Sequence, residues 1–231
     1  MLANGQWVKP AATVDLNGPA PLAANGKPDL SGFWQSQVKY NSDLAVDLSA
    51  GTVEFTPWGR ALYDQRVATN SQADPENVCL PSGTPRINAA GGFPSRIVQT
   101  PGLVVILYEI KMLYRSVFLD GRTVEKNANP TWMGYSTGSW DGDALVVRTT
   151  GFNDRTWLDD RGHPHSESLV VTERYRRPNY GRLTIEITID DPVAYKKPWT
   201  ATEELRLDPD GDLIEYVCIE NEKDAPHLVG K

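Results

Sequence analysis

The sequence predicts a mainly all-β protein, an antiparallel meander closed into a barrel, with one short helix and a long irregular insertion. After residue 95, β-patterned segments of about seven to nine residues alternate with turn signals such as Pro101-Gly102 and Asp141-Gly142. Residues 182–189 alternate strictly between apolar and polar side chains, as a half-buried strand does. Consecutive hairpins favour antiparallel pairing, and this many strands must curl or close to remove their free edges.

Length and charge narrow the classes of protein. The chain has 231 residues, and we expect one domain at residues 29–231 after a flexible spacer at residues 1–28. Its formal net charge of −7 is opposite to the basic surface that nucleic acid requires. No apolar run reaches the roughly 18 residues of a transmembrane helix. The sequence therefore predicts no nucleic-acid partner and no membrane span, and it indicates no oligomeric state.

The N-terminal region predicts a spacer and then a first strand. Residues 8–29 are rich in Pro, Ala, Gly and Asn, like the segment that follows a removed export signal. We therefore expect a periplasmic or secreted protein. The first strand is expected at residues 29–35, where Gly32 permits close approach and Trp34 supplies buried area.

The clearest helix signal lies at residues 56–66. Thr56 can cap the helix, and Pro57 suits its first position. From there to about residue 94, repeated Pro and Gly signals predict an irregular segment that wraps the scaffold. A long functional loop is one interpretation of this insertion.

The remaining strands are expected from residue 96 onward. Their bounds are 96–100, 103–108, 113–119, 134–140, 144–150, 169–176, 182–189, 199–207 and 213–219. The strands at 169–176 and 199–207 each have one face rich in Thr, Glu and Arg. We favour a solvated outer surface for these charge ladders over a polar barrel interior.

Three arginines, Arg96, Arg115 and Arg148, project from otherwise apolar strands. A guanidinium on an inward face needs a carboxylate partner or a bound anion. We expect ion pairs with glutamates on neighbouring strands, namely Glu173, Glu186, Glu203 or Glu215.

The densest group of chemically capable side chains lies in the polar connection 151–167. It holds His163 and His165, whose imidazoles titrate near neutral pH and suit general acid-base catalysis. The two histidines are the leading candidates for proton transfer, and a merely solvated loop is an equally weighted alternative. The carboxylates that could orient them are Asp154, Asp159 and Glu167.

Four other residues are expected around a ligand. Tyr135 or Arg148 could stabilise negative charge that develops on a carbonyl oxygen or enolate, if either faces the same cavity. Trp132 and Trp157 flank the polar loops and are the aromatic residues that we expect to contact a ligand.

No metal or cofactor is expected. His163, His165 and His227 show no diagnostic metal-ligand spacing, and the turn at 208–212 does not fit a calcium loop. Ser136 lies in a Gly-x-Ser-x-Gly motif, but within a predicted strand rather than at a strand-turn-helix elbow. Metal catalysis and a Ser-Asp-His triad therefore rank below general acid-base catalysis.

Cys79 and Cys218 are the two cysteines. An oxidising compartment would permit a disulfide between them, while two buried thiols are equally ordinary. The sequence leaves both possibilities open.

The chain bears two resemblances to known proteins. The start Ser31-Gly32-Phe33-Trp34, before a long meander, resembles the Gly-x-Trp first strand of lipocalin and calycin barrels, which implies a central cavity for a small apolar ligand. Residues 28–231 also resemble an uncharacterised family of exported bacterial proteins. This second resemblance implies export and assigns no activity, cofactor or residue role. Its segments are 129–134, 151–154, 163–167, 172–174 and 189–192.

The preferred functional hypothesis is a cofactor-independent lyase, isomerase or hydrolase. It would hold a small organic molecule in the barrel mouth while His163 or His165 moves a proton. One alternative is a non-catalytic periplasmic carrier of a small apolar ligand. Another is a carbohydrate-binding or carbohydrate-cleaving barrel, which the tryptophan content suggests.

Overall fold

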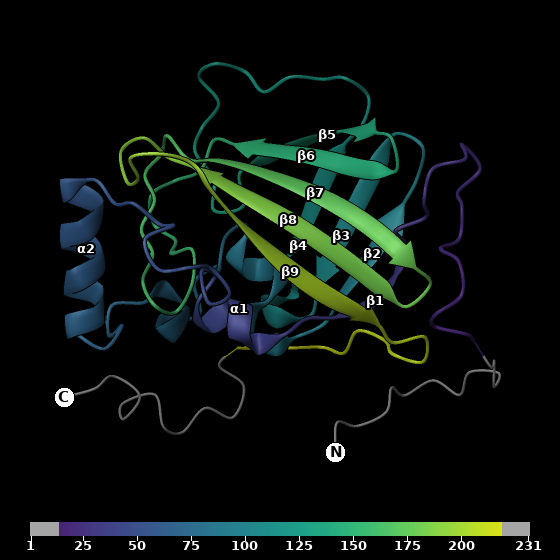
Figure 1. Ribbon diagram of the computed structural model, residues 1–231, viewed down its shortest axis with the longest axis horizontal. Coiled ribbons are helices and arrows are strands. Elements are labelled where there is room, and N and C mark those ends of the chain that lie inside the picture. Colours follow the sequence, from purple (N-terminus) through teal and green to yellow (C-terminus); the bar gives the residue numbers. More distant parts are fainter. Residues whose placement is uncertain (1–13, 219–231) are drawn as a thin grey trace.

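The computed structural model describes residues 14–218 and contains a closed nine-stranded β-barrel (Figure 1). The strands follow one another around the barrel in sequence order, and β1 pairs with β9 to close it. The predicted all-β barrel is thus confirmed, and it is consistent with a lipocalin-like architecture. The strands are β1 Gly32–Gln35, β2 Ser95–Gln99, β3 Leu103–Tyr108, β4 Tyr114–Phe118, β5 Tyr135–Asp141, β6 Ala144–Thr150, β7 Val170–Asn179, β8 Arg182–Asp190 and β9 Trp199–Leu207.

Two short seams divide the barrel into two sheets. Strands β4 and β5 run parallel and share two residue pairs, at Val117 and Phe118 of β4. Strands β1 and β9 are antiparallel and also share two pairs, at Trp34 and Gln35 of β1. Every other neighbouring pair is antiparallel, so the predicted antiparallel pairing is confirmed except between β4 and β5, where it is wrong. The barrel is therefore an antiparallel sheet β1–β4 joined at two seams to an antiparallel sheet β5–β9.

Strand alternation places apolar side chains inside the barrel. On β8 the buried residues are Leu183, Ile185, Ile187 and Ile189. The charge ladders of β7 and β9 lie on the outer face, where Arg176 pairs with Glu186 at 2.7 Å. The solvated outer surface expected for these ladders is therefore what the structure shows.

Helix α2, Pro57–Ala68, lies beside the barrel (Figure 1). As predicted, Pro57 begins the helix, and the hydroxyl oxygen of Thr56 accepts a hydrogen bond from the Gly59 amide at 3.1 Å. A Cβ atom at Gly59 would stand 2.1 Å from the Ala194 carbonyl oxygen, so only glycine permits this packing.

The predicted irregular insertion contains short helical turns rather than strands. Helix α1, Val38–Ser42, packs with two of these turns below the barrel in the view of Figure 1. The turns are η1 Pro75–Val78, η2 Arg86–Asn88 and η3 Ala90–Gly92, and η4 Ile110–Met112 follows β3.

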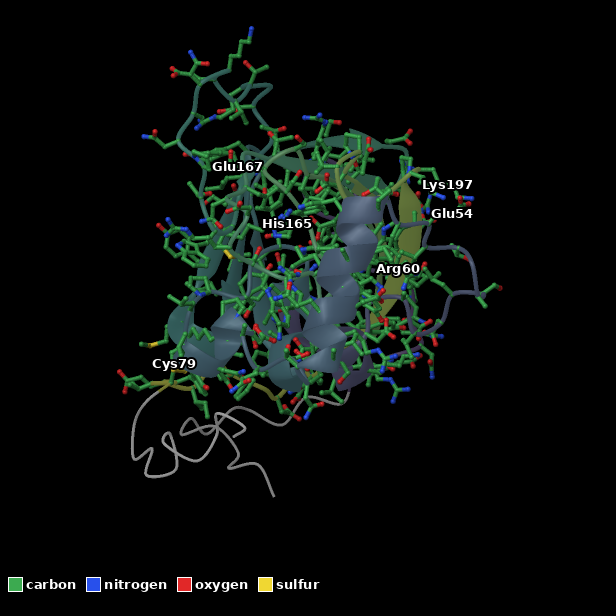
Figure 2. The ribbon with its side chains drawn as sticks, turned by 90° about the vertical axis from the view of Figure 1, so that its left-hand side faces the viewer. Glu54, Arg60, Cys79, His165, Glu167 and Lys197 are labelled. Atoms are coloured by element: carbon green, nitrogen blue, oxygen red, sulfur yellow. A yellow bond between two sulfur atoms is a disulfide. The ribbon has the colours of Figure 1, made fainter. Side chains whose placement is uncertain are left out.

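The segment after β9 differs from the prediction. A strand was expected at 213–219, but residues 211–217 form none, and residue 219 lies outside the described range. Since β9 already pairs with β1, no free edge remains for another strand. Arg96 pairs with Asp212 at 2.6 Å, and Cys79 forms a disulfide with Cys218 (Figure 2 labels Cys79). We call residues 208–218 the C-terminal strap.

The described part of the expected spacer, residues 14–28, lies along the barrel. The Tyr180 amide donates to the Gly18 carbonyl at 2.8 Å, and the Gly181 amide donates to the Leu16 carbonyl at 2.7 Å. These bonds hold the segment against the β7–β8 turn. Within residues 14–218, no helix has both the length and the apolar character needed to cross a bilayer.

Candidate functional site

A buried ion pair lies inside the barrel. Arg115 on β4 contacts both carboxylate oxygens of Glu173 on β7, and Nη1 donates to Oε1 at 3.1 Å. The two side chains are 2% and 0% exposed. Burial acts against the guanidinium charge, but the attraction of Glu173 raises the pKa of Arg115 above its ordinary value. Arg115 therefore carries its positive charge in the barrel interior.

Hydroxyl groups complete the surroundings of Arg115. Its Nε donates to Ser136 Oγ at 2.8 Å, and Nη2 donates to Thr149 Oγ1 at 2.7 Å. The two hydroxyl oxygens lie 2.9 Å apart. Nη1 also donates to the Tyr175 hydroxyl at 3.4 Å. Ser136 is therefore held at the start of β5, next to a fixed positive charge.

Further donors hold Glu173. The Tyr175 hydroxyl and the Asn88 amide each donate to Oε1 at 2.9 Å. The Tyr108 hydroxyl donates to the Asn88 carbonyl oxygen at 2.9 Å. Burial, followed by the charge of Glu173, raises the pKa of Tyr175 well above its ordinary value, so this phenol stays protonated. We call the following residues the interior network: Asn88, Tyr108, Arg115, Ser136, Thr149, Glu173 and Tyr175.

Glu203 is a second buried carboxyl group. It lies on the inner face of β9 and is 1% exposed. Neither of its oxygens has a hydrogen-bond partner within the described part of the chain. Burial, with a smaller contribution from the negative charge of Glu173, raises the pKa of Glu203 well above its ordinary value. Burial therefore favours the protonated, neutral form of this carboxyl group.

A pocket of about 720 Å³ opens beside the β4–β5 seam. Strands β4 and β5 line it together with the connection between them, and we call it the seam pocket. Arg115 and Ser136, two members of the interior network, are among its lining residues. Tyr135 also lines it and donates a hydrogen bond to the Asn129 carbonyl at 2.8 Å. Two members of the interior network thus belong to the wall of the seam pocket.

The structure brings His163 together with Asp159. Nδ1 of His163 lies 2.6 Å from Asp159 Oδ2, and both side chains are buried. The backbone amides of Leu44, Gly162 and His163 also donate to the two oxygens of Asp159. Asp159 therefore orients the imidazole and organises the surrounding loop at the same time.

The ring of His163 is packed among aromatic side chains. It stacks on Phe55 with ring centres 5.7 Å apart, and it lies 4.8 Å from the Tyr63 ring and 5.8 Å from the Trp199 ring. These contacts hold the imidazole in one place between helix α2 and β9.

His165 is 1% exposed, and both of its ring nitrogens have partners. Nδ1 donates to the Ser166 carbonyl at 3.1 Å, so Nε2 accepts from the Thr156 hydroxyl at 2.6 Å. Burial is the main cause that lowers the pKa of His165, which leaves the ring neutral at pH 7. To move a proton, His165 would first have to break one of these two hydrogen bonds.

The other predicted site residues are dispersed. Asp154, Glu167 and Arg148 are exposed, and Arg148 lies on the outer face of β6 (Figure 2 labels Glu167). Trp157 is buried beneath the Arg66 guanidinium, which lies 4.3 Å from its ring centre.

Trp132 is only half-buried, and the guanidinium of Arg155 lies 6.0 Å from its ring centre. Of the predicted catalytic residues, the structure therefore brings Asp159 and His163 together and places Tyr135 at the seam pocket.

A second hollow, of about 430 Å³, lies at the start of helix α2. Arg60 lies 4.3 Å above the Phe55 ring, and Glu54 pairs with Lys197 at 2.7 Å (Figure 2). The sequence-predicted site residues are not among its lining residues. Phe55 lines this hollow and also stacks on the ring of His163.

One group of metal-ligand types occurs within residues 14–218. Ligand atoms of Asp43, Asp159 and His163 lie within 4.8 Å of one another. However, both oxygens of Asp159 and Nδ1 of His163 are already engaged in hydrogen bonds. These bonds explain the cluster without a cation.

Ser136 does not stand at a nucleophile elbow. Strand β5 turns directly into the antiparallel partner β6 rather than into a helix. The partners of its hydroxyl group are Arg115 and Thr149.

The sequence predicted Glu173 and Glu203 only as possible partners of arginine side chains. Both have apolar or aromatic neighbours at positions two residues away, so period-two alternation marks each as an inward-facing carboxyl group. Asn88 carried no such signal, because it reaches the interior network from the irregular insertion. Comparisons with models of protein families and with curated proteins find no match for this chain.

Proposed function

We propose that the protein is a cofactor-independent enzyme that acts on a small organic molecule by proton transfer, with its site at the seam pocket and the interior network. Lyase, isomerase and hydrolase reactions all fit this description. The chemistry would rest on side chains of the chain itself.

One observation carries the proposal: Arg115 belongs both to a fully buried ion pair and to the wall of a pocket open to solvent. A barrel core made only for stability needs no buried ion pair, because apolar side chains of similar volume are often equally stabilising. Buried ionisable groups beside a pocket are typical of functional sites. The position of Arg115 therefore supports a site for chemistry.

The hydrogen-bond directions suggest roles for the pocket residues. Ser136 Oγ accepts a hydrogen bond from Arg115, so the Ser136 hydroxyl can donate either to Thr149 or to a bound molecule. The fixed charge of Arg115 would favour negative charge that develops on a substrate oxygen. Tyr135 offers a second hydroxyl group at the same pocket.

His163 supports a second candidate for the proton-transfer group. Its 2.6 Å contact with Asp159 resembles the base-orienter pair of general acid-base sites. Replacing His163 by Gln while Asp159 is kept separates the two candidates. Turnover that survives in His163→Gln assigns the proton transfer to the interior network.

The test is incubation with a mixture of small metabolites, followed by mass spectrometry of both bound and converted compounds. Met133→Trp would fill the seam pocket that Met133 lines, and Arg148→Gln on the outer face of β6 is the matched control. We expect conversion by the wild type and by the control, and a loss of about tenfold or more in Met133→Trp.

Each other outcome has a definite meaning. A compound that is bound but unchanged would favour the small-molecule carrier, and a bound or cleaved sugar would favour the carbohydrate hypothesis. Full conversion by Met133→Trp would exclude the seam pocket as the substrate site.

We also propose that the protein works outside the cytoplasm, in the periplasm or secreted. The Cys79–Cys218 disulfide supports this, since such bonds persist in oxidising compartments. Fractionation of cells that express the full-length gene product, with thiol labelling of each fraction, tests the proposal.

A further inference from the structure

Within residues 14–218, two polar groups on the inner face of β9 have no hydrogen-bond partner. Its inward side chains include Trp199, Ala201 and Glu203 in alternate positions. Both oxygens of Glu203 and the indole N–H of Trp199 are buried and lack a hydrogen-bond partner among the described residues. Ala201, between them, is the smallest side chain on this face of the strand.

A structural role does not account for Glu203. A buried carboxyl group without hydrogen bonds destabilises the fold, and an apolar residue of similar size would avoid that cost. Its register partner on β8 is Ile185, which offers no polar atom, and Ile185 in turn pairs with Tyr175 on β7. Glu203 thus occupies the same cross-strand row as a member of the interior network, with one apolar residue between them.

The surroundings of Glu203 define what it can bind. Two titratable groups of the interior network, Glu173 and Tyr108, lie close enough to Glu203 for electrostatic interaction. Arg115 is already paired with Glu173. A neutral carboxyl group donates one hydrogen bond and accepts others. Its complement is therefore an uncharged carbonyl or hydroxyl group rather than a cation or an anion.

We infer that Glu203 forms an inner subsite, which receives the uncharged carbonyl or hydroxyl end of the molecule that enters at the seam pocket. This inference rests on the proposed function, because it takes the seam pocket as the entrance. The opposite end of the molecule stays beside Arg115 and Ser136.

Three five-membered-ring probes of similar size test the inference: cyclopentanone, the cyclopentylammonium ion and cyclopentanecarboxylate. Their affinities at pH 7 are measured by ligand-observed NMR. We expect cyclopentanone to bind the wild type about tenfold or more tightly than either ion, because only the ketone accepts a hydrogen bond from a neutral acid without burying a charge.

Two substitutions at Glu203 separate hydrogen bonding from shape. Glu203→Gln keeps a neutral donor and acceptor, so its affinity for cyclopentanone should stay within about threefold of the wild type. Glu203→Leu removes both functions and should weaken binding about tenfold. The melting temperature of Glu203→Leu should be no lower than that of the wild type. This result would show that the weaker binding does not come from unfolding. Glu204→Gln, on the outer face of the same strand, is the matched control.

The outcomes distinguish the two proposals. If Glu203→Leu binds cyclopentanone as well as the wild type does, or if the wild type fails to bind cyclopentanone, the inner subsite is excluded. If Glu203→Leu loses binding while the blocking variant Met133→Trp keeps it, the inner subsite stands and the seam pocket is not the entrance. If Met133→Trp alone loses binding, the seam pocket stands and Glu203 is not part of the site.

Discussion

Arg115 and Glu173 pair inside the barrel from strands β4 and β7, with strands β5 and β6 between them in the sheet. The two side chains therefore meet inside the barrel, across the inner faces of β5 and β6. The pair also spans the β4–β5 seam, where main-chain pairing is shortest along this part of the barrel. The ion pair thus ties the two sheets together where their backbones do so least.

Replacing only one residue of the Arg115–Glu173 pair should therefore lower the free energy of unfolding much more than replacing both residues. We expect Glu173→Gln to lower the free energy of unfolding by about 3–5 kcal/mol, because the buried guanidinium is left without its counter-charge. The double variant Arg115→Met with Glu173→Leu should recover most of this loss. Urea unfolding of the three proteins measures the difference. Arg182→Gln, which breaks an exposed pair with Glu204, should cost less than about 1 kcal/mol. A similarly small cost for Glu173→Gln would contradict the expectation.

Glu203 should make stability depend on pH. Its pKa is raised in the folded state, so above about pH 4.5 the folded protein holds a proton that the unfolded chain has released. The contribution of Glu203 to the free energy of unfolding is therefore fully present below about pH 4.5 and is lost as the pH rises toward the pKa of Glu203 in the folded state. Relative to Glu203→Gln, the wild type should lose up to about 1.4 kcal/mol per pH unit over this window. Urea unfolding of both proteins at pH 4.5, 5.5, 6.5 and 7.5 measures the slope, and parallel curves would refute the assignment.

Asp159 should be important for stability whatever the role of His163. The two carboxylate oxygens of Asp159 accept hydrogen bonds from three backbone amides and contact the imidazole of His163. In Asp159→Asn, the side-chain NH2 group replaces one of these oxygens, so it faces N–H groups that it cannot accept from. We expect Asp159→Asn to lower the free energy of unfolding by about 3 kcal/mol. Asp154→Asn, at an exposed site in the same connection, should change it by less than about 0.5 kcal/mol. Equal effects in the two variants would show that the hydrogen bonds of Asp159 add little.

Reduction of the Cys79–Cys218 disulfide should destabilise the fold. The bond joins residues 139 positions apart, and the chain-entropy relation gives about 5 kcal/mol for a closed loop of that length. Thermal unfolding with and without a reductant that is transparent at the detection wavelength measures the change in melting temperature. A Cys79→Ser, Cys218→Ser double variant should unfold at the lower temperature in both conditions. A reductant effect that persists in the double variant would point to another cause.

Much of the fold follows from local patterns. The capping signal of Thr56 and Pro57 predicted helix α2, and period-two alternation predicted the barrel strands to within a few residues. The strand expected at 213–219 failed because its segment has the right local pattern but no edge to pair with. Which edges remain free depends on barrel closure, a long-range property that a local pattern does not contain.

The residues of the candidate site also differ in whether a local sequence pattern predicts them. The alternation of β7 and β9 already places Glu173 and Glu203 on inward faces, so the sequence held a signal for both. The participation of Asn88 and the opening beside Ser136 depend on how the insertion and the β4–β5 connection pack. The composition of the connection 151–167 predicted a catalytic role for His163 and His165, and that role stays a prediction.

The two seams also imply an order of assembly. Strands β1–β4 and β5–β9 are each contiguous in sequence and pair mostly with their immediate neighbours, apart from the long insertion after β1. Such local hairpins form quickly, whereas contacts between distant parts of the chain wait for loop closure. The late event in folding would then be the meeting of two preformed half-barrels. The disulfide joins the insertion of the first half to the strap that follows the second, so its formation would fasten the two halves once they have met.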